Sequence, residues 1–124
     1  MQLIAIAAGG AIGALFRYWV SSGVHFVVGR SFPYGTLTVN VIGSLLIGLL
    51  YVVFNERFEV AGHWRALLMV GVMGAFTTFS TFSMETLELL EQREVAKALL
   101  NVFLNVGLCI LAAWIGVILT RYVY

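Results

Sequence analysis

Charge is scarce in this sequence of 124 residues, because only 10% of the residues are charged and 61% are hydrophobic. The mean hydropathy is +1.00, and a single proline leaves long helical stretches uninterrupted. A bilayer core about 30 Å thick is crossed by about 20 apolar residues of helix. The composition therefore predicts an integral membrane protein. We expect no soluble domain, since the longest connection is the short polar stretch 55–64.

The sequence also lacks the residue patterns of several kinds of functional site. Cys109 is the single cysteine, so no intrachain disulfide can form. His25 and His63 have no partner at metal-ligand spacing. The first residues lack a basic segment, so we interpret them as a helix of the mature protein and not as a cleaved signal. No motif joins a general base to a nucleophile, which predicts that the protein is not an enzyme; we also expect no nucleic-acid partner.

Four apolar stretches are long enough to cross a bilayer. They cover residues 2–29, 33–54, 65–90 and 97–122. The sequence therefore predicts an all-α integral membrane protein with one four-helix transmembrane domain over residues 1–124.

The basic residues near the ends of these helices are balanced between the two membrane faces. Three lie on the side of the N-terminus and three on the opposite side: Arg57, Arg65 and Arg121 against Arg30, Arg93 and Lys97. Because the Lys and Arg bias sets the direction of insertion, this balance predicts a chain that inserts both ways. We therefore expect dual topology and an antiparallel homodimer. The alternative is a bias too small for counting to detect.

The stretch 71–85 places hydroxyls, phenylalanines and glycines at membrane depth. Threonine is a weak helix former whose hydroxyl competes for backbone hydrogen bonds. We therefore predict that the third helix is broken near its middle, at Gly74–Thr78. In hydrocarbon a break survives only where it is buried in protein or lines a polar cavity, so it marks a candidate site. The alternative is that these hydroxyls only hold helices together.

Two further polar residues lie deep in the predicted helices. Asn40 sits in a span without charge, and its amide is either a donor to an anion in a narrow pore or part of an interhelical hydrogen bond. Arg17 is either part of an electropositive vestibule for anions or a residue whose side chain extends to the interface beside Tyr18 and Trp19.

The fourth helix carries a polar stripe on one face. Asn101, Asn105 and Cys109 follow one another at intervals of one helical turn. A polar stripe that faced lipid would be costly, so we expect it to face protein or a pore. Glu85, the deepest acid, is interpreted either as a gate or as a charge at a helix end.

The sequence resembles the Fluc fluoride channels, also called CrcB proteins, over essentially its whole length. Three motifs carry the resemblance: Gly9-Gly10-x-x-Gly13-Ala14-x-x-Arg17-Tyr18, Gly35-Thr36-Leu37-x-Val39-Asn40 and Gly71-x-x-Gly74-Ala75-x-Thr77-Thr78-Phe79-Ser80-Thr81-Phe82-Ser83-x-Glu85. The third motif is highly specific. The resemblance implies a dual-topology homodimer with two antiparallel fluoride pores and a central structural sodium ion.

The resemblance also implies roles for individual residues. Gly74 and Thr77 would bind sodium through their backbone carbonyls, and Asn40 would be the pore amide. Phe79 and Phe82 would line the pores with their ring edges, which carry partial positive charge; without the resemblance, ordinary packing is the alternative. The further candidates for the fluoride pathway are Ser80, Thr81, Asn105 and Arg17.

Two positions depart from the family pattern. Ala75 stands where the family usually has glycine, a small change that should leave the break intact. Asn101 and Asn105 stand where the family typically presents Tyr and Ser, so here the polar track uses amides in place of hydroxyls.

These observations together predict a passive fluoride-selective channel that exports cytoplasmic fluoride through a bacterial-type inner membrane. Selectivity would arise from dehydration, because only closely placed donors replace the water shell of fluoride. One alternative is a small proton-coupled multidrug exporter, which requires a titratable carboxylate within the membrane. Another is a membrane scaffold subunit that transports nothing.

Overall fold

The computed structural model describes residues 1–123, which form helices joined by short connections and contain no strand. Tyr124, the last residue of the predicted domain, lies outside the described residues. Four helical spans are long and apolar enough to cross a membrane: Gln2–Val28, Tyr34–Arg57, Gly62–Glu91 and Val95–Val123. The chain is thus all-helical with four membrane-capable segments, as the composition predicts.

The first and last spans are single helices, α1 (Gln2–Val28) and α6 (Val95–Val123). The second span consists of α2 (Tyr34–Val52) and a π-helical turn, η1 (Val53–Arg57), so it runs three residues beyond the predicted 33–54. Gly29 ends α1 with a positive φ of 86°, a conformation that suits glycine.

The third span is composite. It begins with α3 (Gly62–Arg65), continues as the π-helix η2 (Ala66–Met73) and ends its first half with α4 (Gly74–Phe76). Its second half is α5 (Phe79–Glu91). A π-helix of this length is rare, and π-helical turns often lie near functional sites.

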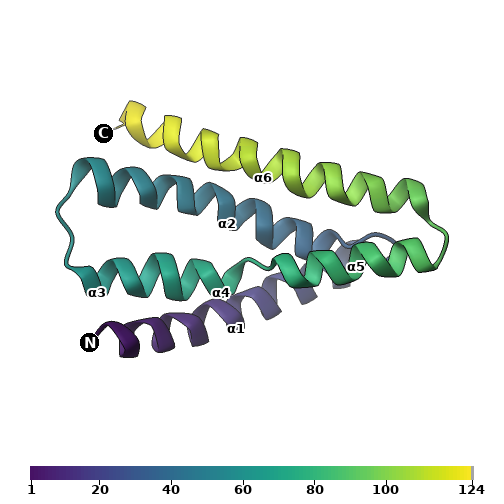
Figure 1. Cartoon of the computed structure of the whole chain (residues 1–124), viewed down its shortest axis with the longest axis horizontal. Coiled ribbons are helices and arrows are strands. Elements are labelled where there is room, and N and C mark those ends of the chain that lie inside the picture. The colour runs from purple at the N-terminus through teal and green to yellow at the C-terminus, as the bar shows by residue number, and fades with distance from the viewer. Residues whose placement is uncertain (124) are drawn as a thin grey trace.

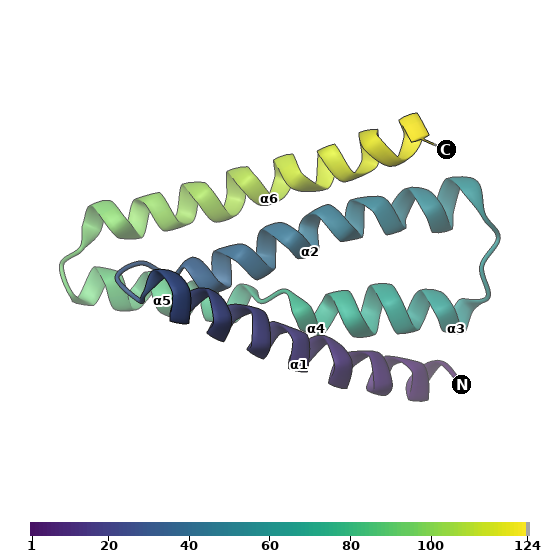
Figure 2. The ribbon, with the colours of Figure 1, turned by 180° about the vertical axis from the view of Figure 1, so that it is seen from behind.

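The helices form an elongated bundle in which α2 lies beside α6 and α1 lies beside η2 and α4 (Figures 1 and 2). The start of α1, the connection between η1 and α3 and the end of α6 share one end of the bundle (Figure 1). The other two connections share the opposite end. The six basic residues counted above therefore lie three at each end.

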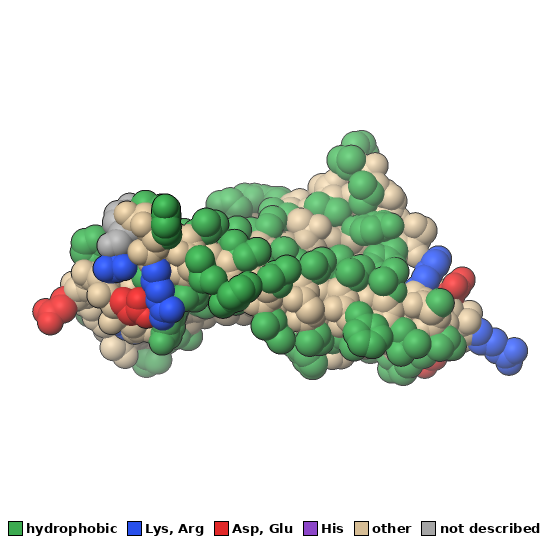
Figure 3. All heavy atoms as spheres, turned by 90° about the horizontal axis from the view of Figure 1, so that it is seen from above, with side chains coloured by type: hydrophobic (Ala, Val, Ile, Leu, Met, Phe, Trp, Pro, Cys, Tyr) green, Lys and Arg blue, Asp and Glu red, His purple; other side chains and the backbone are tan. Residues whose placement is uncertain are grey.

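On the face seen in Figure 3, hydrophobic side chains cover much of the middle, whereas charged side chains gather at the two ends. Only 11% to 28% of each apolar window is buried inside the chain. The bundle therefore presents most of its apolar surface outward, as expected for a chain in contact with lipid or with a second membrane subunit.

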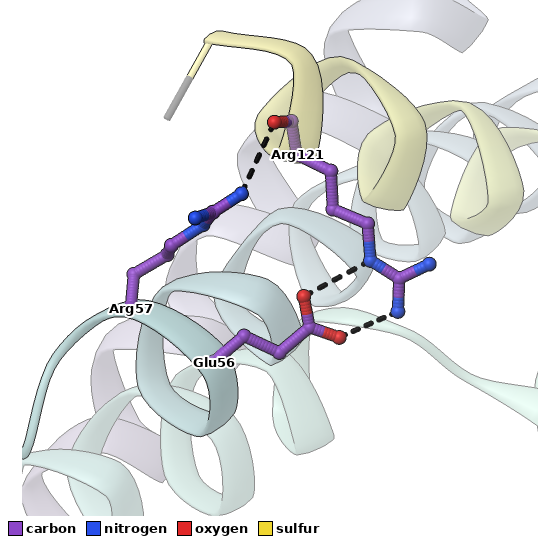
Figure 4. Close-up of polar contacts among 3 residues, drawn as sticks. All are labelled: Glu56, Arg57 and Arg121. Carbon is purple, nitrogen blue, oxygen red and sulfur yellow. Dashed lines mark hydrogen bonds and ion pairs between the residues drawn. The ribbon is translucent and has the colours of Figure 1, made fainter.

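Polar contacts tie the helices together at the end that carries the start of α1. Arg121 donates to both carboxylate oxygens of Glu56, at 3.0 and 2.5 Å, and Arg57 donates to the carbonyl of Arg121 at 3.2 Å (Figure 4). Arg65 donates to the carbonyl of Phe54 at 2.7 Å. These contacts join η1 to α6 and to the start of the third span.

Candidate functional site

The chain is extended for two residues in the middle of the third span. Helix α4 ends at Phe76, Thr77 has φ −86° and ψ 156°, and Thr78 has φ −150° and ψ 114°. The hydroxyl of Thr78 caps α5 by accepting a hydrogen bond from the backbone N–H of Thr81 at 3.1 Å. Threonine is a preferred residue at this position because its oxygen pairs with a backbone N–H that the helix leaves without a partner.

Asn40, from α2, pairs with both backbone groups of Thr78. In a continuous α-helix the Thr78 N–H would donate to the carbonyl of Gly74. Here it donates to Oδ1 of Asn40 at 2.8 Å, while Nδ2 of Asn40 donates to the Thr78 carbonyl at 3.1 Å. One of the two interpretations of Asn40, the interhelical hydrogen bond, is thus present in the structure.

A chain of amides continues from Asn40 into α6. Nδ2 of Asn40 also donates to Oδ1 of Asn105 at 3.1 Å. Nδ2 of Asn105 donates to both oxygens of Asn101, the carbonyl at 3.0 Å and Oδ1 at 2.9 Å. Asn101 then donates to the hydroxyl of Thr86 at 2.9 Å, and Thr86 donates to the carbonyl of Phe82 at 2.7 Å. The polar stripe of the fourth helix therefore faces protein at Asn101 and Asn105, and all three asparagines are buried.

A hollow of about 500 Å³ opens beside this chain, between α2, the third span and α6. Six of the residues predicted as pore or sodium ligands line it: Asn40, Gly74, Thr77, Phe79, Phe82 and Asn105. None of the described lining residues is charged. The hollow therefore combines amides, backbone oxygens and aromatic rings.

The two aromatic candidates lie against each other on α5. The ring centroids of Phe79 and Phe82 are 5.3 Å apart, and the rings meet edge to face at 61°. Phe82 is only 7% exposed, whereas Phe79 is 76% exposed. Phe79 therefore projects out of the single chain, at the opening of the hollow.

Three predicted residues do not line the hollow. Ser80 and Thr81 lie exposed on the first turn of α5, where their hydroxyls meet that of Thr78, at 3.4 and 3.0 Å. Arg17 lies half-buried on α1, and within residues 1–123 it makes no hydrogen bond or ion pair. The single chain therefore brings six candidates together and leaves these three outside.

Two residues of the site were not among the predicted site residues. Thr78 caps α5 and pairs with Asn40, and Thr86 ends the chain of amides. The density of hydroxyls in 71–85 predicts a break, but only the packing of α2 and α6 against α5 shows which partner each hydroxyl bonds.

Glu85 lies in a second, smaller hollow of about 220 Å³ near the opposite end of the bundle from the chain termini. His25, Arg30 and Glu88 line the same hollow. Glu85 is therefore separate from the Asn40 hollow, among charged residues that include a second carboxylate.

The sequence is similar to a protein family and to several named proteins over almost its whole length. Residues 4–117 match the family described as CrcB-like protein, Camphor Resistance (CrcB). The "Fluoride-specific ion channel FluC" of Methylococcus capsulatus is 54% identical over 121 residues, which cover 98% of this chain and 53% of that protein.

Two shorter relatives carry the same name. The protein of Magnetococcus marinus is 48% identical over 123 residues, 99% of this chain and 100% of the relative. That of Alteromonas mediterranea is 55% identical over 117 residues, 94% and 91% of the two chains. The chain thus spans about half the length of the Methylococcus protein and nearly all of the other two.

Proposed function

Because the chain belongs to the CrcB family, we propose that it is a passive, fluoride-selective ion channel and not an enzyme. The observation that carries this proposal is the similarity, at about half of all positions and along nearly the whole chain, to proteins named fluoride-specific ion channels. Four membrane-capable helices supply the required multi-pass architecture. We further propose that the channel lies in an inner membrane and releases cytoplasmic fluoride down its gradient, which relieves fluoride toxicity.

The hollow beside the break supports an anion pathway. Fluoride holds its water tightly, so a selective pore must offer closely placed groups that replace the hydration shell. The amide N–H groups of Asn40 and the positive ring edges of Phe79 and Phe82 are groups of this kind. None carries a full positive charge, so a bound anion can leave again.

We propose that the working channel is an antiparallel, dual-topology homodimer with two pores. Each end of the bundle carries three of the basic residues that set insertion, so neither orientation is favoured. The exposure of Phe79 also supports a second subunit, because a hollow open on one side does not enclose an ion. In such a dimer Ser80, Thr81 and Arg17, which lie outside the hollow, would be available to complete the pathway or its vestibule.

The break also fits the structural sodium ion that the family implies. The Thr78 N–H pairs with Asn40, which leaves the Gly74 carbonyl without its usual helical donor, and Thr77 is extended. Both residues line the hollow. Backbone carbonyls suit a hard monovalent cation, and a symmetric pair of subunits would double the number of oxygens. Gly74 and Thr77 would hold the ion, whose charge would fix the two breaks relative to each other.

The proposed function is tested by fluoride and chloride efflux from liposomes that contain the purified protein, recorded with ion-selective electrodes. We expect rapid loss of fluoride without loss of chloride. The Phe79→Ile variant should abolish fluoride efflux while eluting as a folded protein of wild-type size. Phe103→Ile is the matched control, because Phe103 is 71% exposed on α6 and does not line the hollow; it should conduct normally.

The same assay separates the alternatives. A proton-coupled exporter would show no fluoride efflux but would take up cationic drugs when a pH gradient is imposed. A scaffold subunit would show neither flux, and Phe79→Ile would change nothing beyond stability. Absence of fluoride efflux from well-folded protein would therefore overturn the channel proposal.

The dimer and the ion have tests of their own. A thiol-reactive reagent that does not cross membranes should label a cysteine added at the C-terminus, in a Cys109→Ser background, on about half of the molecules in sealed vesicles if topology is dual. Labelling of all or none would contradict dual topology. Replacement of sodium by a large organic cation should lower the unfolding temperature by mass action, and an unchanged temperature would contradict a bound structural sodium.

A further inference from the structure

The amide chain that joins α2 to α6 has a fixed direction. The N–H of Thr78 requires an oxygen from Asn40, and its carbonyl requires a nitrogen, so only one orientation of the Asn40 amide satisfies both. The orientation of the Asn105 amide is defined as well, because its nitrogen donates to the backbone carbonyl and the side-chain oxygen of Asn101. The oxygen of Asn105 therefore faces Asn40.

This arrangement occupies every donor that Asn40 possesses. One of its two N–H groups pairs with the carbonyl of Thr78 and the other with Oδ1 of Asn105, both at 3.1 Å. An anion that enters the hollow and accepts a hydrogen bond from Asn40 must first displace one of these oxygens. The Thr78 carbonyl is a backbone group of the extended segment between α4 and α5, so its displacement would require the main chain to move. The Asn105 oxygen belongs to a side chain that lines the hollow, and a side chain can change rotamer without any shift of the backbone at Thr78.

We propose that Asn105 is a specificity-determining residue that acts as a displaceable acceptor. Its oxygen holds the second N–H of Asn40 while no anion is present, and an ion must compete with it to bind. Fluoride is small and a strong hydrogen-bond acceptor, and hydrogen bonds to an ionised acceptor are about twice as strong as neutral ones. Chloride is larger and a weaker acceptor, so it does not displace the amide. This inference rests on the proposed function and adds a source of selectivity to dehydration.

A purely structural role for Asn105 predicts something different. In that case the Asn40–Asn105 hydrogen bond only fastens α6 to α2, and its loss lowers stability without changing the ratio of fluoride to chloride flux. The two roles are therefore separated by selectivity and not by stability.

The test uses variants that differ only in the acceptor oxygen. Asn105→Ser keeps an acceptor oxygen in the hollow, one bond closer to the backbone than Oδ1, whereas Asn105→Ala has no side-chain acceptor. Asn105→Thr and Asn105→Val form a second pair of nearly equal shape. We expect the Ala and Val variants to admit chloride, with a fluoride-to-chloride efflux ratio at least about tenfold below that of the Ser and Thr variants. Asn55→Ala, at an exposed position at the end of the bundle, should keep the wild-type ratio.

Equal ratios within both pairs would overturn the inference while leaving fluoride efflux by the wild-type protein intact. Loss of both anion fluxes in Ala and Val variants that remain folded would overturn it too, because it would make Asn105 a required ligand. A wild-type protein without fluoride efflux would overturn the proposed function and the inference together.

A measurement on the wild-type protein covers the case in which the variants do not fold. The chain has four asparagines, Asn40, Asn55, Asn101 and Asn105, so selective labelling gives a small set of side-chain amide signals in an NMR spectrum. Titration with fluoride should shift the side-chain carbonyl carbon of Asn105 and the amide protons of Asn40, with Asn55 unchanged as the internal reference. Chloride should shift none of them. A fluoride-induced shift of Asn40 without any shift of Asn105 would contradict displacement.

Discussion

Two parts of the bundle bring helices together by opposite means. Where α1 meets η2 at Gly9 and Gly13, and where α2 meets α6 at Gly48 and Gly116, glycines bring the helix backbones into close contact. At the break in the third span, side-chain amides fill the gap and replace backbone hydrogen bonds. The first kind of contact cannot adjust to a change in shape, whereas the second has polar groups that can exchange partners. We call the glycine contacts at Gly9, Gly13 and Gly48 the frame, and the polar contacts among Asn40, Thr78 and Asn105 the centre. The comparison indicates that the frame is rigid and that the polar groups of the centre can change partners.

The glycine contacts show how little room the frame leaves. A Cβ added at Gly13 would lie 2.2 Å from the carbonyl oxygen of Val72, and one added at Gly9 would lie 2.3 Å from that of Leu67. Between α2 and α6, a Cβ at Gly48 would lie 2.2 Å from the carbonyl oxygen of Ala113. These neighbours are backbone atoms, so whole helices would have to separate.

Near the break in the third span, a Cβ added to a glycine would meet a side chain or almost nothing, and not the backbone of another helix. A Cβ added at Gly43 would meet Cγ2 of Thr77 at 2.2 Å, which is the end of a side chain and not backbone. A Cβ added at Gly74 would meet only one atom within 4 Å, the carbonyl oxygen of Met69 at 3.9 Å. Close to the break, the hydrogen bonds between Asn40 and Thr78 therefore restrict substitutions more than the available space does.

The largest effect is expected where that pairing is removed. Asn40→Leu fills the same volume but leaves the N–H and the carbonyl of Thr78 buried without a partner. Each such group costs about 1–3 kcal/mol, so the loss in unfolding free energy should be about 2–6 kcal/mol. The measurement is thermal unfolding in detergent followed by size-exclusion chromatography.

Asn55→Leu is the control for this substitution, because Asn55 lies exposed at the end of the bundle and, within residues 1–123, accepts only from Arg65, which also donates to the carbonyl of Phe54. It should unfold near the wild-type temperature. Wild-type stability of Asn40→Leu would mean that the Thr78 backbone groups find other partners, and the contrast between frame and centre would lose its basis.

The next largest effect is expected in the glycine frame. Gly13→Ala inserts a methyl group against the Val72 backbone, and overpacking of this kind typically costs about 1–3 kcal/mol. Gly10→Ala is a matched control three residues away, because no atom lies within 4 Å of its added Cβ. Alanine is also the better helix former, so Gly10→Ala should match or exceed the wild-type unfolding temperature. Equal destabilisation by both variants would indicate a general effect of losing glycine and not a close helix contact.

Much of the frame follows from the sequence. Lengths of apolar stretches predict four helices, and small residues four apart in 9–13 predict a close contact, which Gly9 and Gly13 make with η2. The sequence does not distinguish these glycines from Gly10, whose added Cβ would meet no atom of a neighbouring helix within 4 Å among the described residues. Which face of α1 meets η2 depends on the orientation of both helices, and the spacing of small residues fits either face.

The centre is predicted less completely. The stripe of Asn101 and Asn105 predicts a buried face on α6, which the structure has. Their partners Thr86, Asn40 and Thr78 lie on other helices. Which residues form hydrogen bonds therefore depends on the position of each residue along the axis of the bundle. The π-helical course of η2 shifts that position, and a regular period of 3.6 residues per turn does not predict it.

A smaller effect is expected at the cap of α5. Thr78→Ala removes the hydroxyl that accepts from Thr81 but keeps the backbone groups that pair with Asn40. Loss of an N-cap typically costs about 1 kcal/mol, so Thr78→Ala should unfold at a modestly lower temperature while Thr78→Ser should not. Destabilisation as large as that of Asn40→Leu would show that the cap, and not the amide, maintains the break.

The smallest effect is expected at the end of the bundle, where an ion pair, and not a glycine contact or a side-chain amide, joins two helices. Arg121 and Glu56 pair at 2.5 Å, but their side chains are 50% and 32% exposed, so solvent and salt screen the attraction. Glu56→Gln keeps the shape and removes the charge, and should lower the unfolding temperature only slightly at low salt and not measurably at high salt. Glu59→Gln, at an exposed acid in the connection that follows η1, provides the baseline. A large loss of stability that persists at high salt would mean that this end, too, belongs to the rigid frame, with the carbonyl of Arg121 and the guanidinium of Arg57 as part of one fixed contact.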